Sequence, residues 1–145
     1  MDYLNAFEIS ASGMAVEKTR LETIALNLAN ANTAKGVDGT AYKPLRVLAA
    51  PKIDFESQLQ GVAGANLPAG VEVTAVQQTN AEPRLVYEPG HPYANKNGYV
   101  EYPGVNSVTE MLHLIEATRS YEANVKALNA AKSMALRALE IGRQK

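Results

Sequence analysis

The sequence contains no cysteine. Disulfide frameworks, thiol nucleophiles and cysteine-based metal sites are therefore excluded. Tryptophan is also absent and there are only two phenylalanines, whereas 23 of the 145 residues are alanine. Because alanine buries little area, we expect a thin core. Such a chain either is modestly stable alone or completes its core with residues of neighbouring chains.

Concentrated charge and long apolar runs are missing as well. The chain has 14 basic and 15 acidic residues and no run of Lys or Arg, which argues against nucleic-acid binding. The longest apolar run is four residues, 47–50, so we expect no membrane insertion. The first residues lack a basic segment followed by an apolar one, and we expect no cleaved signal peptide.

Helix-breaking residues are concentrated in the middle of the chain. All seven prolines lie between residues 44 and 103, and eight of the ten glycines lie between residues 36 and 104. Both ends are therefore free to form long helices. We predict an α+β fold with an N-terminal helix in residues 1–33, a small β-rich insert in 34–105 and a long C-terminal helix in 106–145.

The first segment has a heptad pattern, which predicts a helix with one apolar seam. The seam positions are Leu4, Phe7, Ala11, Met14, Lys18, Leu21, Ala25 and Leu28. The pattern stops at Asn-Ala-Asn-Thr, residues 30–33, because asparagine favours turns. Gly13 inside this helix is either a close contact with a neighbouring backbone or a tolerated defect.

The last segment predicts a helix of roughly 34 residues, about 50 Å long. Ser107 and Glu110 have the spacing of a capping box, with Ser107 as the N-cap. The seam positions that follow are Met111, Leu114, Thr118, Tyr121, Val125, Leu128, Lys132, Ala135 and Leu139. Further apolar residues lie off this seam, which favours a helix that contacts several neighbours.

The middle segment predicts short strands at residues 45–48, 71–76, 85–87 and 99–102. Turns are predicted at 89–92 and 97–98, and a loop at 56–70. Its tyrosines either form the core of the insert or lie in an interface, and the sequence leaves both open. These tyrosines are Tyr42, Tyr87, Tyr93, Tyr99 and Tyr102.

Residues that could carry catalysis or bind a metal are few. Glu110 and His113 form one E-x-x-H step, but a metal site needs more ligands and the only other histidine is His91. Ser12 lies within a predicted helix, not on a strand-to-helix turn. No glycine-rich phosphate-binding motif is present. The sequence therefore predicts no enzyme, no metal and no cofactor.

Three segments resemble the bacterial flagellar axial family of rod, hook and hook-associated proteins. Residues 25–33, Ala-Leu-Asn-Leu-Ala-Asn-Ala-Asn-Thr, resemble the signature that closes the family's first helix, and Gly39 and Tyr42 fill the places that follow it. Residues 87–100, with Pro-Gly-His-Pro and Gly-Tyr-Val, and residues 105–124 resemble the family's proximal-rod members. Lys43-Pro44 departs from the basic pair expected after the tyrosine.

The resemblance implies a structural subunit of the proximal rod, the hollow drive shaft that transmits torque, surrounds the export channel and is needed for motility. It implies that the terminal helices pair as a coiled-coil-like bundle. The implied location is the basal-body rod, which spans the periplasm. The implied partners are other subunits of the proximal and distal rod, the base with its export gate and, during secretion, the flagellar type III export apparatus.

In this interpretation the chain assembles with its own copies and with other subunits through the helical seams. The residues expected at that interface are Leu4, Phe7, Met14, Leu21, Asn27, Leu28, Asn30, Asn32, Met111, Leu114, Tyr121, Val125, Leu128 and Leu139. In a dilute monomer the terminal helices would have little to bury against, and we expect them to fold on assembly. The alternative is a soluble two-helix adaptor, which predicts a folded and highly helical monomer or dimer.

Overall fold

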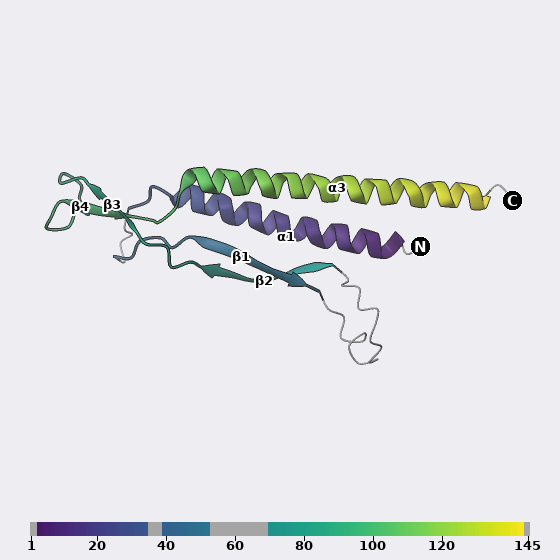
Figure 1. The fold of residues 1–145 in the computed structure, drawn as a ribbon, viewed down its shortest axis with the longest axis horizontal. Coiled ribbons are helices and arrows are strands. Elements are labelled where there is room, and N and C mark those ends of the chain that lie inside the picture. Colours follow the sequence, from purple (N-terminus) through teal and green to yellow (C-terminus); the bar gives the residue numbers. More distant parts are fainter. Residues whose placement is uncertain (1–2, 35–38, 53–69, 144–145) are drawn as a thin grey trace, which may run out of the picture. The chain divides into compact units, whose positions relative to one another are not determined.

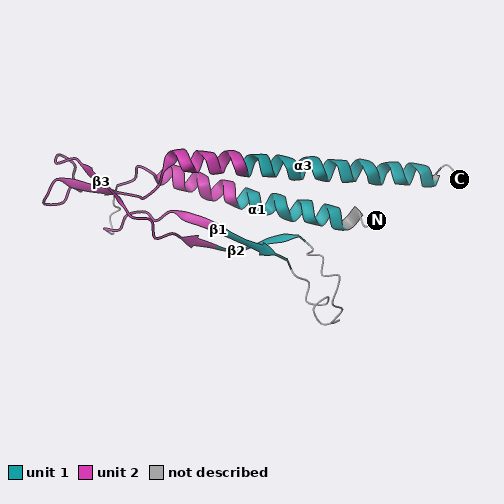
Figure 2. Cartoon of the chain, viewed as in Figure 1, with its two compact units in different colours: residues 1–19, 48–75, 117–145 teal, residues 20–47, 76–116 magenta. Residues whose placement is uncertain are grey.

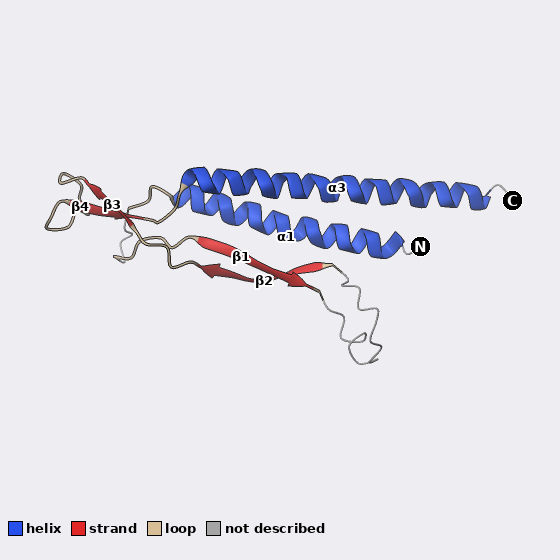
Figure 3. Ribbon diagram, in the orientation of Figure 1, coloured by secondary structure: helices blue, strands red, loops and turns tan. Residues whose placement is uncertain are grey.

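The computed structural model describes residues 3–34, 39–52 and 70–143 of the chain. In chain order its elements are α1 (Tyr3–Asn30), β1 (Leu45–Pro51), β2 (Val71–Gln78), β3 (Arg84–Tyr87), β4 (Tyr99–Tyr102) and α3 (Ser107–Arg143) (Figure 1). Two long terminal helices enclose, in sequence, a small antiparallel β insert (Figure 3). This confirms the predicted α+β class and the four predicted strands.

Helix α1 ends where the asparagine cluster begins. The Asn30 Nδ2 group donates to the Leu26 carbonyl at 2.8 Å, and the Thr33 N–H donates to the Asn30 carbonyl at 3.1 Å. The Ala31 N–H reaches the Leu28 carbonyl at 3.2 Å, which tightens the last turn. Local hydrogen bonds of asparagine and threonine thus replace the continuation of the helix.

Helix α3 begins with a different cap from the one predicted. The Asn106 side-chain oxygen accepts from the Val108 N–H at 3.0 Å and from the Thr109 N–H at 3.2 Å, so Asn106 is the N-cap. Ser107 is already the first helical residue. The capping box of Ser107 and Glu110 was therefore wrong. The Glu110 side chain takes other partners, described below.

The insert forms two separate two-stranded sheets. In the first, hydrogen bonds from Lys52 N–H to the Gly70 carbonyl (2.9 Å) and from Thr79 N–H to the Pro44 carbonyl (2.7 Å) flank β1 and β2 and give them an antiparallel order. In the second, β3 and β4 are antiparallel with Arg84 opposite Tyr102. The predicted loop 56–70 lies outside the described residues except for Gly70.

The chain divides into two compact units (Figure 2). We call residues 1–19, 48–75 and 117–145 unit 1, and residues 20–47 and 76–116 unit 2. Among the described residues the buried apolar side chains are Val16, Ala117 and Ala131 in unit 1 and Ile24, Ala31 and Val100 in unit 2. Half of them are alanine, so each unit has the thin core that the composition predicts.

Candidate assembly surfaces and the Asn27 network

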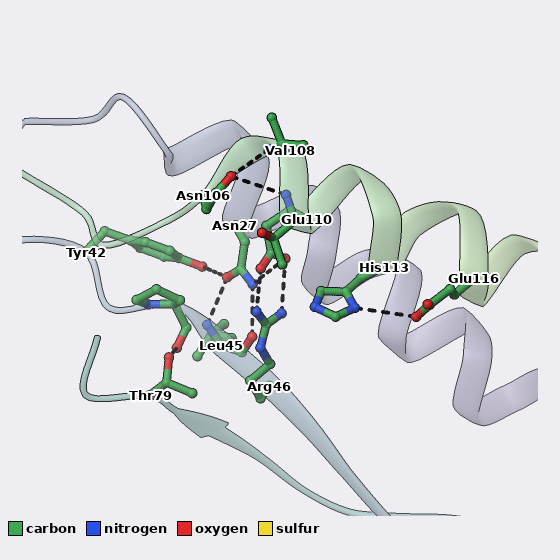
Figure 4. Close-up of polar contacts among 12 residues, drawn as sticks. Asn27, Tyr42, Leu45, Arg46, Thr79, Asn106, Val108, Glu110, His113 and Glu116 are labelled. Carbon is green, nitrogen blue, oxygen red and sulfur yellow. Dashed lines mark hydrogen bonds and ion pairs between the residues drawn. The ribbon is translucent and has the colours of Figure 1, made fainter. Parts of the chain in front are cut away.

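Asn27 is fully buried in unit 2 and uses its whole amide group (Figure 4). Its Oδ1 atom accepts from the Leu45 N–H at 2.8 Å and from the Tyr42 hydroxyl at 2.9 Å. Its Nδ2 group donates to the Leu45 carbonyl at 2.9 Å and to Glu110 Oε2 at 3.2 Å. A backbone N–H only donates and a carboxylate only accepts, so this network fixes the orientation of the amide. Asn27 thus joins the end of α1 to the first residue of β1 and to the first turns of α3.

Glu110 is buried and shares its carboxylate between two elements. Arg46 on β1 donates Nη2 to Oε1 at 2.6 Å and Nη1 to Oε2 at 3.1 Å, which is a bidentate ion pair. The Arg46 side chain is 40 % exposed, whereas that of Glu110 is 3 % exposed. A buried carboxylate is costly unless it is paired and hydrogen-bonded, and here both oxygens have partners.

Tyr42 completes the network from the segment before β1. Burial, and after it the negative charge of Glu110, raises the pKa of Tyr42 above its ordinary value of 10.0. The hydroxyl therefore keeps its proton near neutral pH and can donate to Asn27. Next to it, Thr79 holds the Pro44 carbonyl with both its N–H (2.7 Å) and its hydroxyl (2.9 Å).

The two helices are antiparallel and have the same register in both units. In unit 2, Asn27 on α1 meets Glu110 on α3, and in unit 1, Gly13 meets Asn124. In two antiparallel helices, residues that lie opposite each other have residue numbers with a constant sum, and for both of these pairs the sum is 137. At this register Tyr3, the first described residue of α1, is level with Met134. The described residues of α1 therefore offer no partner to the end of α3 beyond residue 134.

The interface residues predicted on the first helix lie beside the buried face, apart from Asn27. Phe7, Met14, Leu21 and Leu28 are half-buried, and the buried positions next to them include Ser10, Val16 and Ile24. Asn30 is half-buried and Asn32 is exposed, with its side-chain oxygen 3.3 Å from Arg84 Nη2. The side chain of Leu4 lies outside the described residues. The large side chains of the predicted seam thus keep part of their surface free.

The interface residues predicted on the last helix are more exposed. Leu114, Val125 and Leu128 are half-buried, whereas Met111 and Leu139 are 55 % and 66 % exposed and Tyr121 is also exposed. Other large apolar residues of α3 are exposed too, and these are Val108, Leu112, Ile115, Met134, Leu136 and Ile141. An apolar surface of this kind is typical of a protein that packs against other chains.

The tyrosines of the insert differ in their burial. Tyr42 and Tyr102 are half-buried, and Tyr87, Tyr93 and Tyr99 are exposed. Tyr87 and Tyr99 lie opposite each other on the β3–β4 hairpin, with ring centroids 5.3 Å apart. Arg84 lies over the Tyr102 ring at 5.6 Å, a cation–π contact.

The residues considered for catalysis or metal binding have structural partners. His113 lies 3.6 Å from Glu116, and Glu110 is bound by Arg46. Ser12 donates to the Ile9 carbonyl and accepts from the Val71 N–H. Within residues 3–34, 39–52 and 70–143 no group of three potential ligands could hold a metal ion. No helix in the same ranges is long and apolar enough to cross a membrane.

Two members of the network could not be found from the sequence. Arg46 lies in the predicted strand 45–48, but nothing in its neighbourhood points to a carboxylate 64 residues away. Glu110 was assigned to a cap because its local spacing fits one. Asn27 and Tyr42 were both singled out by the resemblance, and the hydrogen bond between them is the reason why they belong together.

Two family models and several relatives match the chain. The model "Flagella basal body rod protein" matches residues 7–34, and the model "Flagellar basal body rod FlgEFG protein C-terminal" matches residues 96–141. The flagellar basal-body rod protein FlgC of Salmonella typhimurium is 41 % identical over 98 % of this chain and 99 % of its own length. FlgC of Bacillus subtilis is 38 % identical over 99 % of this chain and its own full length.

A more divergent relative, FlgC of Borreliella burgdorferi, is still 32 % identical over 97 % of this chain and 98 % of its own length. The match therefore covers the two helices and the insert alike, and it confirms the resemblance seen in the sequence. The chain belongs to the FlgC family of flagellar basal-body rod proteins and is a structural subunit of the basal-body rod.

Proposed function

We propose that the chain is a subunit of the proximal part of the rod and acts there as a building block, not as an enzyme. In this proposal the subunits form a hollow shaft that transmits torque and surrounds the export channel. The chain assembles with its own copies and with other rod subunits, from the base and its export gate to the distal rod. It reaches the periplasm through the flagellar type III export apparatus, and it binds neither nucleic acid nor membrane.

The observation that carries the proposal is the exposed apolar surface of α3. Leu136, Leu139 and Ile141 are 52 %, 66 % and 75 % exposed and lie beyond the last residue that can be level with the described part of α1. Exposed side chains of this size have no stabilising role in a free subunit. In an assembly they would be buried against neighbouring helices, where each contributes free energy of association.

The predicted seams extend this surface. Phe7, Met14, Leu21 and Leu28 on α1, and Leu114, Val125 and Leu128 on α3, are half-buried in the free chain and have further area to bury. We propose that these positions and the exposed Met111, Tyr121 and Leu139 form the contacts between subunits. Heterologous contacts of this kind extend a helical assembly without closing on themselves.

The free subunit is then incompletely stable. We propose that its helical ends, residues 1–33 and 106–145, are largely disordered in dilute solution and fold on assembly, around the insert 34–105. The thin core supports this, because alanine and half-buried side chains offset little of the conformational entropy. Circular dichroism of a dilute monomer with about half its residues helical would contradict it.

The test of the proposed function compares two aspartate substitutions in the same segment of α3. Leu139→Asp places a charge in the exposed apolar surface, and Arg137→Asp places the same charge at an exposed polar position. Because Leu139 is exposed in the free chain, its substitution leaves the free subunit as stable as before. We expect Leu139→Asp to abolish swimming and the recovery of hook–basal bodies, and Arg137→Asp to retain both.

Deletion of the gene gives the complementary result. Mass spectrometry of purified hook–basal bodies should find the chain, and a deletion strain should build neither rod nor hook. If the chain were missing from the particles and the deletion strain swam, the rod proposal would be wrong. The soluble two-helix adaptor would then be the better explanation of the two helices.

A further inference from the structure

In unit 1 a glycine of α1 faces an asparagine of α3. A β-carbon built on Gly13 would lie 2.8 Å from Nδ2, 3.0 Å from Oδ1 and 3.1 Å from Cγ of Asn124. Non-bonded heavy atoms involving carbon prefer about 3.5–4.0 Å. The Asn124 carboxamide therefore occupies this space, and any other residue at position 13 would require that side chain to move. Of the two possibilities for Gly13, close contact is the one found, with a side chain instead of a backbone.

This contact belongs to a regular stripe along α3. Glu110, Ala117 and Ala131 are buried at seven-residue intervals, and the half-buried Asn124 occupies the same spacing. On α1, Ser10 and Val16 are buried three residues on either side of the half-buried Gly13. Small and polar residues thus make up much of the seam within the chain, which also buries Val16 and Ile24. Most of the large apolar residues of α3 are left exposed.

A seam of alanines alone would not define a register, because each alanine resembles the next. A polar side chain that fits one position only does define it, as buried asparagines do in coiled coils. A shift by one heptad would place Asn124 level with Arg20 or Ala6, and both carry a β-carbon where Gly13 has none. The contact also discriminates against the α3 helix of another copy whenever that helix meets α1 in a different register.

We propose that the Gly13–Asn124 contact is a specificity determinant of helix pairing. It selects α1 of the same chain, in one register, as the partner of α3, and it keeps the large apolar residues of α3 available for other surfaces. A second polar contact, Asn27 with Glu110, has the same register in unit 2. The proposal concerns the folding of one subunit and holds whether or not the proposed rod function is correct.

The test uses the absence of cysteine from the chain. Ala6→Cys and Ala131→Cys introduce one thiol pair that is level at this register and lies one heptad away from Gly13 and Asn124. In a glutathione buffer, the ratio of intrachain disulfide to free thiols measures how often the two helices are closed in this register. The ratio is compared for the parent, Gly13→Ala, Asn124→Ala and the double variant, which together form a double-mutant cycle.

We expect Gly13→Ala to lower the ratio about fivefold when Asn124 is present. Disulfide-linked dimers should increase at the same time. In the Asn124→Ala background the same substitution should leave the ratio unchanged or raise it, since the space is free and alanine favours helix. Gly142→Ala is the matched control, because its β-carbon would meet nothing within 4 Å. Its effect should be the same in both backgrounds.

The four variants are also oxidised in intact cells and separated on non-reducing gels, so that a weakly folded free chain does not hide the effect. A lower intrachain yield for Gly13→Ala in the Asn124 background alone, in either setting, supports the proposal. If Gly13→Ala changed the yield by one common factor in both backgrounds and in both settings, the proposal would be overturned.

Discussion

The two units hold their helix segments together by different chemistry. In unit 2 a buried amide and a buried carboxylate bind Tyr42, Leu45 and Arg46 through directional hydrogen bonds. In unit 1 the described helix segments meet where Gly13 faces Asn124, close to the buried Val16, and the strand β2 is held to α1 by Ser12. In unit 2 the helix segments are held by particular polar partners, and in unit 1 their contact requires a residue without a side chain at Gly13.

The two kinds of contact serve different purposes, one fixing the fold of the chain and the other allowing the helices to approach closely. Polar contacts fix geometry because an unpaired buried polar group is expensive, so only one arrangement satisfies all of them. A small-residue seam brings helices close together and directs the large apolar side chains outward. Strongly exposed apolar side chains occur in both units, such as Leu139 and Ile141 in unit 1 and Val108 in unit 2. A subunit that must both keep its own fold and bind neighbours needs both kinds of region.

The largest loss of stability should come from Arg46→Met, which removes the arginine of the hydrogen-bond network in unit 2. It leaves the Glu110 carboxylate buried without its cation, and we expect the free energy of unfolding to fall by about 2–4 kcal/mol. Urea denaturation measures the loss; for this and the variants below it is carried out in an osmolyte that favours the folded chain, because the helical ends of the dilute chain are proposed to be largely disordered. The matched control is Arg84→Met, which removes an exposed arginine and should cost less than about 1 kcal/mol.

A second substitution shows whether the lost stability comes from the unpaired charge. Glu110→Gln removes that charge, and in the Arg46→Met background it should recover stability. If the double variant were less stable than Arg46→Met alone, the cost would lie in lost packing of the arginine side chain. The network would then not be the feature that distinguishes unit 2.

The next largest effect should come from Gly70→Ala in unit 1. Gly70 is buried with φ +118°, and a β-carbon there would clash with Ser12 Oγ. We expect a loss of about 2–3 kcal/mol from backbone strain and this clash. Hydrogen exchange at the Val71 amide, which donates to Ser12, reports it locally. Gly90→Ala is the control, because nothing lies within 4 Å of its β-carbon, and a similar loss there would refute the argument.

Much of the fold could be predicted from the distribution of helix-breaking residues. Proline and glycine are confined to the middle, so α1 and α3 form at the ends with long uninterrupted periodicity. The four strands followed from short β-branched and aromatic runs between turn signals. These features are local, and local features are what a single sequence expresses directly.

The contacts that hold the parts together were less predictable, because they join residues that are distant in the sequence. The capping-box spacing at Ser107 was a plausible local solution, but Asn106 caps the helix and Glu110 is bound by Arg46 and Asn27. The apolar heptads of α1 indicated a seam, whereas the buried face includes Ser10 and Asn27. On α3 large apolar residues such as Met111 and Leu139 are exposed, so apolar periodicity alone did not locate the buried face.

A smaller effect should separate half-buried from exposed positions in unit 1. Leu128 is half-buried, so Leu128→Ala should cost about 1–2 kcal/mol in the free chain, less than the 2–5 kcal/mol of a fully buried leucine. Leu139→Ala at the exposed position should change the stability by less than about 0.5 kcal/mol. Thermal unfolding of both variants checks the order. Equal losses of stability for the two variants would mean that the exposed fraction of a side chain does not predict its contribution to the stability of α3.

The smallest effect concerns the protonation of Tyr42 in unit 2. At neutral pH Tyr42→Phe removes one hydrogen bond to Asn27 and should cost about 1 kcal/mol. The pKa of Tyr42 is raised in the folded state, first by burial and then by the charge of Glu110. The folded chain therefore binds the proton more tightly than the unfolded chain, and stability is constant below about pH 10 and falls as the pH rises above it. Tyr42→Phe should make this alkaline loss smaller.

Part of the loss should remain in that variant. Partial burial and Glu88 also raise the pKa of Tyr102, against the opposing charge of Arg84. Unfolding measured between pH 8 and 11 for Tyr42→Phe, Tyr102→Phe and the double variant separates the two contributions, and the double variant should have the flattest profile. If Tyr42→Phe left the alkaline slope unchanged, the hydroxyl would not be held in its protonated form by the network. The polar character of unit 2 would then depend on the Arg46–Glu110 pair and Asn27 alone.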